Sequence, residues 1–478
     1  MGFTGQFLAS LKSIYTGDTI QCEVNGLSTR PIYLRRGLRQ GCSLSPILFA
    51  LYISEIGDDL SLSGEGFQLG SVCVSGILFA DDIVLVSRTS QGLLRLLSLV
   101  YDHTKKLKLD INTDKDKSEV ISPLGEAGDE WNVVDNSGDT VLSLTQVLEY
   151  KYLGSYVKNT MYRTAVTKVD QCIAKAHKYK GACIHISRDG PDVVDMVQAT
   201  WVNVAIPSIL VGCEMIPFPE SKIAEIDRVQ NQIAKYALGI PVSSASFCAQ
   251  TELGFKPFKQ VLYEHQLKFY FRVLLLGDTR WVKQALRDHF SCAWSSPYLE
   301  YICRLRSELN MPVIPLSMHV FYKLVNDHFV DLTNRQVGLS KTTCVNPITK
   351  FSRCKYVMEG EPSSMLAKFK FGNAGLGNRF PRPGHLVTQK CCPLCPTMTL
   401  NTESHLTFFC FAVEAVRKQQ TSFASFRNMC QAKGYSDDKM FNLFINGMDC
   451  HGNPVSVEVL LVRGQDLQVL TKAWLALW

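Results

Sequence analysis

The sequence predicts an α+β protein of about three domains, and three observations carry that prediction. Its length of 478 residues corresponds to about three domains at roughly 150 residues each. Strand-like, helix-like and hairpin-like segments alternate over residues 1–158, whereas residues 159–310 have a helical pattern. We therefore expect an α+β domain, then a helical region, a mixed connector over residues 311–385, and a cysteine-containing region with a tail over residues 386–478.

The composition is that of an ordinary globular protein. Hydrophobic residues make up 46% and charged residues 20%, which excludes a wholly disordered, collagen-like or coiled-coil chain. The net charge of +6 permits a polyanionic partner without requiring one. The most apolar stretch, residues 199–218, contains Asn203, Pro207 and Glu214, which are costly in a bilayer. We expect it to be a buried element, and we expect no membrane partner.

Cysteine is unusually frequent, and the count of 17 cannot pair completely within one chain. Most of these residues are scattered among apolar neighbours, as are Cys22, Cys73, Cys172 and Cys248. The first ten residues do not form a secretory signal. We expect buried free thiols in a reducing compartment, and hence an intracellular protein of the nucleus or cytoplasm.

The first element is a hairpin. Thr19–Val24 is strand-like, Asn25-Gly26 is the strongest short hairpin signal, and Arg30–Arg35 is the return strand. Ser45 is a good N-cap and Pro46 fits the first helical position, so a helix is expected from Pro46 to about Leu60. Apolar residues cover most of its surface, which predicts a central position in the domain.

A second hairpin carries a pair of carboxylates. Two apolar runs within Gly76–Val86 flank Asp81 and Asp82, which places both at the tip. Two like charges about 4 Å apart repel by about 4 kcal/mol at an effective dielectric near 20. A divalent cation relieves that repulsion, and Mg²⁺ prefers carboxylate and phosphate oxygens. The alternative is a solvated turn, in which aspartate is common.

The remaining elements follow in order. A helix over Gln91–Leu109 precedes strands at Lys115–Ile121 and Tyr150–Val157. The helical region has segments at 161–185, 191–211, 221–238 and 261–276. The first of these helices carries a basic stretch that either contacts nucleic acid or forms a solvated face: Lys168, Lys175, His177, Lys178 and Lys180.

A zinc site is predicted in the last region. Cys392, Cys395, His405 and Cys410 have the spacing C-x2-C-x9-H-x4-C, which supplies the four S/N ligands that Zn²⁺ takes tetrahedrally. Cys391 is an alternative ligand with a less usual spacing. The other interpretation is a set of free thiols and a surface histidine.

Several segments resemble motifs of one enzyme family. Phe79–Asp82 (FADD) resembles the F/YxDD box of reverse transcriptases, and Arg39–Pro46 (RQGCSLSP) resembles their RQGxxLSP block. Tyr152–Gly154 (YLG) resembles their primer grip, and Lys117 lies where a motif containing a lysine is expected. The chain is similar to reverse transcriptases of non-LTR (LINE-type) retrotransposons, tightly over residues 17–157 and loosely afterwards.

The resemblance implies a fold and an activity. The fold would be a right-hand polymerase palm, partial and with most of the fingers missing, followed by an α-helical thumb and a small zinc-knuckle region. The activity would be RNA-directed DNA polymerisation by two-metal nucleotidyl transfer. The implied partners are an RNA template, a DNA primer and deoxynucleoside triphosphates. The implied cofactors are Mg²⁺ (or Mn²⁺) and Zn²⁺.

The resemblance also implies residue roles. Asp81 and Asp82 would be the catalytic metal ligands. Gln40 and Gly41 would lie by the template base and the incoming nucleotide. Lys117 would supply charge or a proton near the leaving pyrophosphate, or is a plain surface lysine. The primer would contact the YLG segment; the alternative is that this segment is only a packed strand. Phosphates would contact Arg35, Arg36 and Arg39; the alternative is that these arginines form a solvated basic loop.

One departure from the family concerns a third carboxylate. Such enzymes carry another aspartate in a strand of the form FDxxxAFD upstream of the region matched here. Sixteen residues precede Gly17 and none is acidic, and Asp18 is a poor substitute. We therefore expect an N-terminally truncated element copy or partial gene model that is inactive as it stands. The alternative is a catalytically dead nucleic-acid-binding remnant or a domesticated protein.

Overall fold

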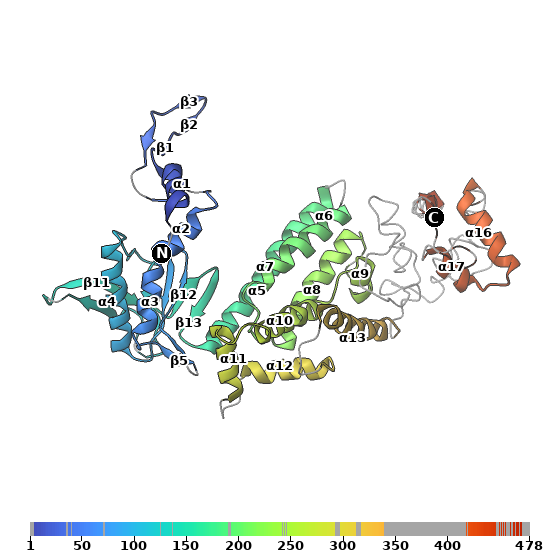
Figure 1. The fold of residues 1–478 in the computed structure, drawn as a ribbon. Helices are drawn as coiled ribbons and strands as arrows, with labels where there is room; N and C mark the ends of the chain where they lie inside the picture. Colours follow the sequence, from blue (N-terminus) through green and yellow to red (C-terminus); the bar gives the residue numbers. More distant parts are fainter. Residues whose placement is uncertain are drawn as a thin grey trace. The chain divides into compact units, whose positions relative to one another are not determined.

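The chain folds into two compact units in a computed structural model (Figure 1). The first unit comprises residues 1–159 and 277–291, and the second comprises residues 160–276 and 292–478. The structure describes residues 4–338 and much of residues 417–470, with short gaps at 35–36, 40, 70–71, 125, 136, 190–192, 241, 243, 245, 292–296 and 312–316.

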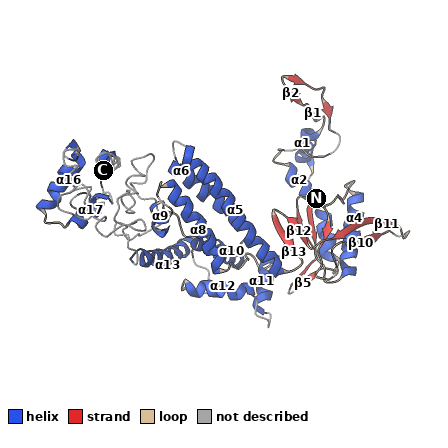
Figure 2. Ribbon diagram, turned by 180° about the vertical axis from the view of Figure 1, so that it is seen from behind, coloured by secondary structure: helices blue, strands red, loops and turns tan. Residues whose placement is uncertain are grey.

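All strands of the described residues lie in the first unit, as the red segments of Figure 2 show. They are β1 (Thr19–Ile20), β2 (Glu23–Val24), β3 (Leu27–Ser28), β4 (Ile32–Tyr33), β5 (Phe67–Leu69), β6 (Val72–Val74), β7 (Gly76–Phe79), β8 (Asp82–Leu85), β9 (Glu119–Val120), β10 (Glu130–Val134), β11 (Thr140–Gln146), β12 (Glu149–Tyr152) and β13 (Ser155–Lys158). Antiparallel pairs form between β1 and β4, β2 and β3, β5 and β6, β7 and β8, and β12 and β13. A three-stranded sheet has the order β10-β11-β9, with β11 and β9 parallel.

The helices of the first unit are α1 (Gly5–Tyr15), α2 (Ser45–Tyr52), α3 (Ser54–Leu62), α4 (Ser90–Lys106) and α11 (Trp281–Ser291). Helix α4 is central because it is apolar on two sides. One side packs Leu96 and Val100 against Ile56 and Leu60 of α3 and against the β7–β8 hairpin. The other side packs Leu97 against the three-stranded sheet. The mixture of helix and strand confirms the predicted α+β class for this unit.

The predicted helix from Pro46 to about Leu60 is interrupted. Ile53 separates α2 from α3, and the central position belongs to α3, whose Ile56 and Leu60 are buried. In α2 only Ser45 is buried, so the prediction of a central helix was wrong for its first half. Ser45 does not cap the helix; its hydroxyl donates to the carbonyl of Arg39 at 2.8 Å.

The described part of the second unit is helical. Its elements are α5 (Met161–Asp189), α6 (Val193–Ala199), the π-helical η1 (Thr200–Ala205), α7 (Ile206–Leu210), α8 (Glu220–Ala237), α9 (Ser246–Glu252), α10 (Phe258–Leu274), α12 (Pro297–Glu308), α13 (Met318–Gly338), α16 (Thr421–Ala432) and α17 (Asp437–Ile445). Helix α5 packs along α8, α6 and α7, and Trp201 of η1 is fully buried and donates to Gln230 of α8 at 2.7 Å.

The apolar stretch 199–218 is a core element, as predicted. Trp201, Ala205, Ile209 and Cys213 within it are fully buried. No helix among the described residues is long and apolar enough to cross a bilayer. The thiol prediction is confirmed for Cys172, whereas Cys22 is exposed and contradicts it.

Candidate active site

The carboxylate pair lies at the tip of the β7–β8 hairpin, as predicted. Phe79 pairs with Asp82, so Ala80 and Asp81 form a two-residue turn. Both carboxylates are exposed, and neither forms a hydrogen bond or ion pair with another described residue. Ala80 has a φ of 52°, in the left-handed region that side chains with a Cβ disfavour. The turn therefore presents two acidic side chains to solvent, and their oxygens are available for a cation.

The base of this hairpin is fixed by close packing. Gly76 opens β7, and a Cβ at that position would lie 2.8 Å from Cδ1 of Leu60 in α3. Leu78 and Ile83 pack against the core that α3 shares with α4. The exposed tip is thus carried by two short strands whose other end is anchored in the core.

A second hairpin, β12–β13, contains the YLG segment. The sequence predicted one strand over Tyr150–Val157, but the chain reverses at Leu153 and Gly154, which have φ values of 45° and 79°. This is the geometry of a two-residue turn with positive φ at both central residues. The correction has a local cause: Tyr152 pairs with Ser155, which leaves Leu153 and Gly154 to form the turn.

Strand β12 brings the two hairpins into electrostatic contact. Burial raises the pKa of Tyr150 and of Tyr152, and the negative charge of Asp82 raises the pKa of both further. The Tyr150 hydroxyl also donates to the carbonyl of Lys117 at 2.7 Å. The structure therefore brings together Asp82, the YLG strand and the Lys117 loop, which are up to 70 positions apart (82 to 152).

Tyr150 is a site residue that motif reasoning missed. Residues two apart in a strand point to the same face, so the position of Tyr152 in the YLG segment places Tyr150 beside it. That alternation was visible in the sequence. The hydrogen bond to Lys117 was not, because it joins residues 33 positions apart.

The arginine-containing loop has a different arrangement from the one predicted. Arg39 forms an ion pair with Asp18, donates to the carbonyl of Ile14 and lies over the Tyr15 ring, 5.4 Å from its centroid. The Asp18 carboxylate is therefore already paired with the Arg39 guanidinium. Gly41 is exposed with a φ of 82°, and Arg35, Arg36 and Gln40 lie outside the described residues. No hydrogen bond or ion pair of the described residues links this loop to Asp81 or Asp82.

Cys42 in the same loop has an altered acidity. The Tyr15 hydroxyl lies 3.5 Å from its Sγ atom. This hydrogen bond, with backbone N–H groups at the start of α2, lowers the pKa of Cys42 to about 7. A larger share of this thiol is therefore ionised near neutral pH than of an ordinary cysteine.

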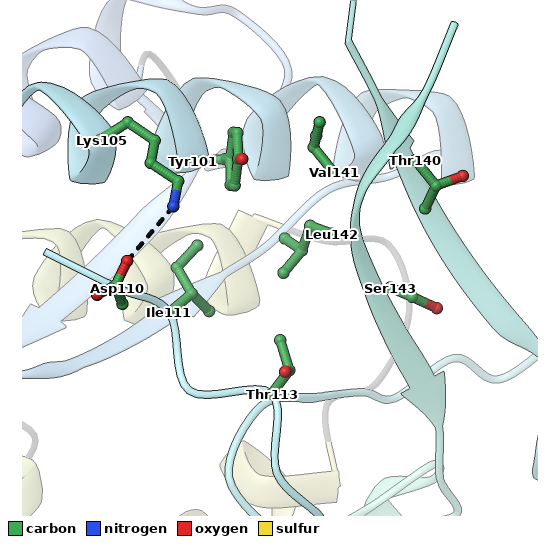
Figure 3. A pocket seen from close by; sticks show the side chains of 9 residues that line it. All are labelled: Tyr101, Lys105, Asp110, Ile111, Thr113, Thr140, Val141, Leu142 and Ser143. Atoms are coloured by element: carbon green, nitrogen blue, oxygen red, sulfur yellow. Dashed lines mark hydrogen bonds and ion pairs between the residues drawn. The ribbon is translucent and has the colours of Figure 1, made fainter.

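A pocket of about 340 Å³ lies elsewhere in the first unit (Figure 3). It is lined by Tyr101 and Lys105 of α4, by Asp110, and by residues of β11. Lys105 and Asp110 form an ion pair at 3.3 Å, drawn as the dashed line. The pocket contains none of the predicted site residues, and its one acidic group is already paired, so it is a poor candidate for metal chemistry.

The structure describes the predicted magnesium ligands but not the predicted zinc ligands. Among the residues that the structure describes, no group of three or more histidine, cysteine or acidic side chains is placed to hold a metal ion, so Asp81 and Asp82 have no third protein ligand there. The four predicted zinc ligands lie outside the described residues: Cys392, Cys395, His405 and Cys410. The zinc site stays a prediction.

The basic stretch of α5 is largely directed into the protein. Lys168 is buried, Lys175 donates to the carbonyl of Ser208 at 2.7 Å, and Lys180 donates to Oε1 of Gln232 at 3.2 Å. Only His177 and Lys178 of the five basic residues are exposed.

Comparison with known proteins agrees with the motifs. The family described as reverse transcriptase (RNA-dependent DNA polymerase) matches residues 4–157. The retrovirus-related Pol polyprotein from the type-2 retrotransposable element R2DM of Drosophila melanogaster is 30% identical over 153 residues, which is 31% of this chain and 14% of that protein. The Pol polyprotein from the type-1 element R2 of Nasonia vitripennis is 30% identical over 113 residues, covering 24% of this chain and 11% of that protein. The chain therefore spans only a small part of the length of these relatives.

Proposed function

We propose that the chain is an RNA-directed DNA polymerase module, because residues 4–157 match the reverse transcriptase family and are similar to Pol polyproteins of R2 retrotransposable elements. It would extend a DNA primer on an RNA template with deoxynucleoside triphosphates. The first-unit hairpins would form the partial palm, and the helices of the second unit would act as a thumb that holds the duplex.

The observation that carries this proposal is the exposed carboxylate pair on an anchored hairpin. Asp81 and Asp82 are adjacent, solvent-facing and free of ion pairs with the described residues. Two such groups suit Mg²⁺, which takes carboxylate oxygens together with substrate phosphates and water. Asp81 and Asp82 would therefore hold Mg²⁺ (or Mn²⁺), which when bound neutralises the charge that develops on the transferring phosphoryl group.

Other residues would act on the substrates directly. The exposed ammonium of Lys117 would face the triphosphate, and the strand ending at Tyr152 would support the primer beside Asp82. Gln40 and Gly41 would approach the template base and the nucleotide, where a glycine lets the backbone come close. Arg36 would contact phosphate, whereas the ion pair of Arg39 with Asp18 gives Arg39 a supporting role in its own loop.

A second candidate is a nucleic-acid-binding protein without polymerase activity. It is favoured by the absence of a third potential ligand around Asp81 and Asp82 within the described part of the chain. Two-metal transfer normally relies on more protein carboxylates than these two.

A primer-extension assay decides between the two functions. The purified chain is given an annealed DNA primer on an RNA template, the four deoxynucleoside triphosphates and Mg²⁺. Extension by the intact chain would support the polymerase module and contradict the expectation of an inactive truncated copy. Asp81→Ala should then reduce extension by at least about 100-fold, which is the order expected when preorganised charge stabilisation is lost. The matched control, Asp102→Ala, changes an exposed aspartate of α4 that forms no hydrogen bond or ion pair with another described residue, and it should leave extension unchanged. Absence of extension by the intact chain would favour the second candidate.

A further inference from the structure

The Lys117 loop is a tightly turned segment whose lysine side chain is unengaged. The Lys117 amide donates to the carbonyl of Asp114 at 3.0 Å, and the Asp116 amide donates to Glu119 at 3.2 Å. Asp116 has a φ of 66°, so the turn is sharp. The Lys117 side chain forms no hydrogen bond or ion pair with another described residue. The backbone of the loop therefore fixes where the Lys117 side chain starts, and so limits the region that its flexible ammonium can reach.

One side chain from a distant strand holds that backbone. The Tyr150 hydroxyl donates to the Lys117 carbonyl at 2.7 Å, which is a short, well-formed hydrogen bond. Burial and the charges of Asp82 and Glu119 raise the pKa of Tyr150, so its hydroxyl stays protonated and remains a donor at ordinary pH. The Tyr150 hydroxyl thus bonds to the Lys117 loop and also lies in the field of Asp82.

We propose that Tyr150 is a positioning residue that fixes the Lys117 loop beside Asp82 and so sets the place of the Lys117 ammonium for the incoming triphosphate. This inference rests on the proposed polymerase function. Tyr150 itself need not touch a substrate. It acts through the carbonyl of Lys117, whose side chain is the group that meets the nucleotide.

The kinetic test is a double-mutant cycle between Tyr150 and Lys117. Tyr150→Phe removes the donor and keeps the ring. We expect the KM for the nucleotide to rise about five- to tenfold, the range that one lost hydrogen bond produces. Affinity for the primer–template should stay unchanged. In Lys117→Ala, adding Tyr150→Phe should have no further effect, because the group being positioned is gone.

The matched control is Tyr156→Phe on β13, since Tyr156 forms no hydrogen bond with another described residue. It should leave the KM unchanged. Fully additive effects in the cycle, or an equal effect of Tyr156→Phe, would overturn the inference.

A second measurement does not depend on activity. Hydrogen–deuterium exchange in residues 112–119 should speed up in Tyr150→Phe and stay at the wild-type rate in Tyr156→Phe. Unchanged exchange in Tyr150→Phe would overturn the tether even if extension fell. If the wild-type chain extends no primer, the polymerase proposal fails, while the exchange rates still decide whether Tyr150 holds the loop.

Discussion

Two turns of the first unit share a backbone geometry but differ in the residue that adopts it. Asn25 and Gly26 have φ values of 53° and 78°, and Leu153 and Gly154 have 45° and 79°. Asparagine tolerates the left-handed region because its short polar side chain bonds locally, whereas leucine loses about 1–2 kcal/mol there. The candidate primer-contacting turn therefore stores strain that the other turn lacks. Strain of this kind is often kept where function needs a particular side chain.

Replacing Leu153 should separate stability from activity. We expect Leu153→Asn to raise the free energy of unfolding by about 1 kcal/mol, because asparagine relieves the positive φ and Leu153 is 49% exposed and loses little burial. Extension should fall if Leu153 supports the primer. Urea denaturation and primer extension measure the two effects. Leu124→Asn, at an exposed leucine without positive φ, is the control, and an equal gain there would contradict the strain argument.

Asp227 predicts a pH dependence of stability. It lies on α8, accepts a hydrogen bond from the Phe258 amide at 2.8 Å, and burial raises its pKa to about 6. Because the folded pKa exceeds the unfolded value, the folded state binds the proton more tightly. The resulting stabilisation is complete below about pH 4 and is lost as the pH rises through about 6.

Asp227→Asn removes this titration and keeps the acceptor oxygen. Relative to wild type, its free energy of unfolding should increase by about 3 kcal/mol between pH 4 and pH 7, since each tenfold difference in proton affinity between the folded and unfolded states corresponds to about 1.4 kcal/mol. Denaturation curves at several pH values measure the difference. A flat difference between Asp227→Asn and wild type across this range would refute the prediction.

At the scale of elements, Gly66 is a position where two segments meet without room for a side chain. A Cβ there would lie 2.4 Å from the carbonyl oxygen of Val74, which belongs to the backbone of β6 and cannot move aside cheaply. Gly57 in α3 is the opposite case, because its nearest neighbour would be Cδ1 of Leu78 at 4.0 Å. We therefore expect alanine to lower the free energy of unfolding at Gly66 and to raise it at Gly57.

Gly66→Ala should lower the free energy of unfolding by about 1–3 kcal/mol, the usual cost of forcing atoms into a packed region. Gly57→Ala should raise it by about 0.5–1 kcal/mol, because alanine is the better helix former. Both variants can be measured by urea denaturation followed by circular dichroism. Equal effects of the two substitutions would be inconsistent with the close approach at Gly66.

Elements with strong local signals were predictable, and those that depend on distant contacts were not. Asn25-Gly26 and the two apolar runs around Asp81 specified their hairpins. The β10–β11 hairpin was missed because no such turn pair joins its strands. The reversal at Leu153 was hidden because leucine is typical of a strand interior. Likewise, nothing near Arg39 in sequence predicted its partner Asp18, 21 positions away.

At the scale of the whole molecule, each unit offers a different part of the proposed activity. The first unit carries the carboxylate pair, Lys117 and the YLG turn, and the second carries a long helix with a buried apolar core. The family match covers residues 4–157, so the roles proposed for the helical unit and for residues 386–478 need their own tests.

The zinc prediction can be tested on the full chain. We expect about one bound zinc per chain by elemental analysis, lost in Cys395→Ser because a tetrahedral site needs all four ligands. Cys391→Ser should retain the metal, since Cys391 is not in the favoured ligand set. An unchanged zinc content in Cys395→Ser would remove the site, and loss in Cys391→Ser would reassign the ligand.

The inward direction of the α5 lysines has a consequence for ionic strength. A protein that neutralises phosphates releases condensed counterions, and each phosphate on duplex DNA contributes about −0.9 to the slope of log affinity against log salt concentration. Lys175 and Lys180 are bonded within the protein and Lys168 is buried, so Lys178 is the one lysine of the stretch that is exposed. Binding of α5 to a duplex would thus release about one counterion rather than four. The fit of the helix to the shape of the duplex would then have to contribute more to binding than its lysine charges do.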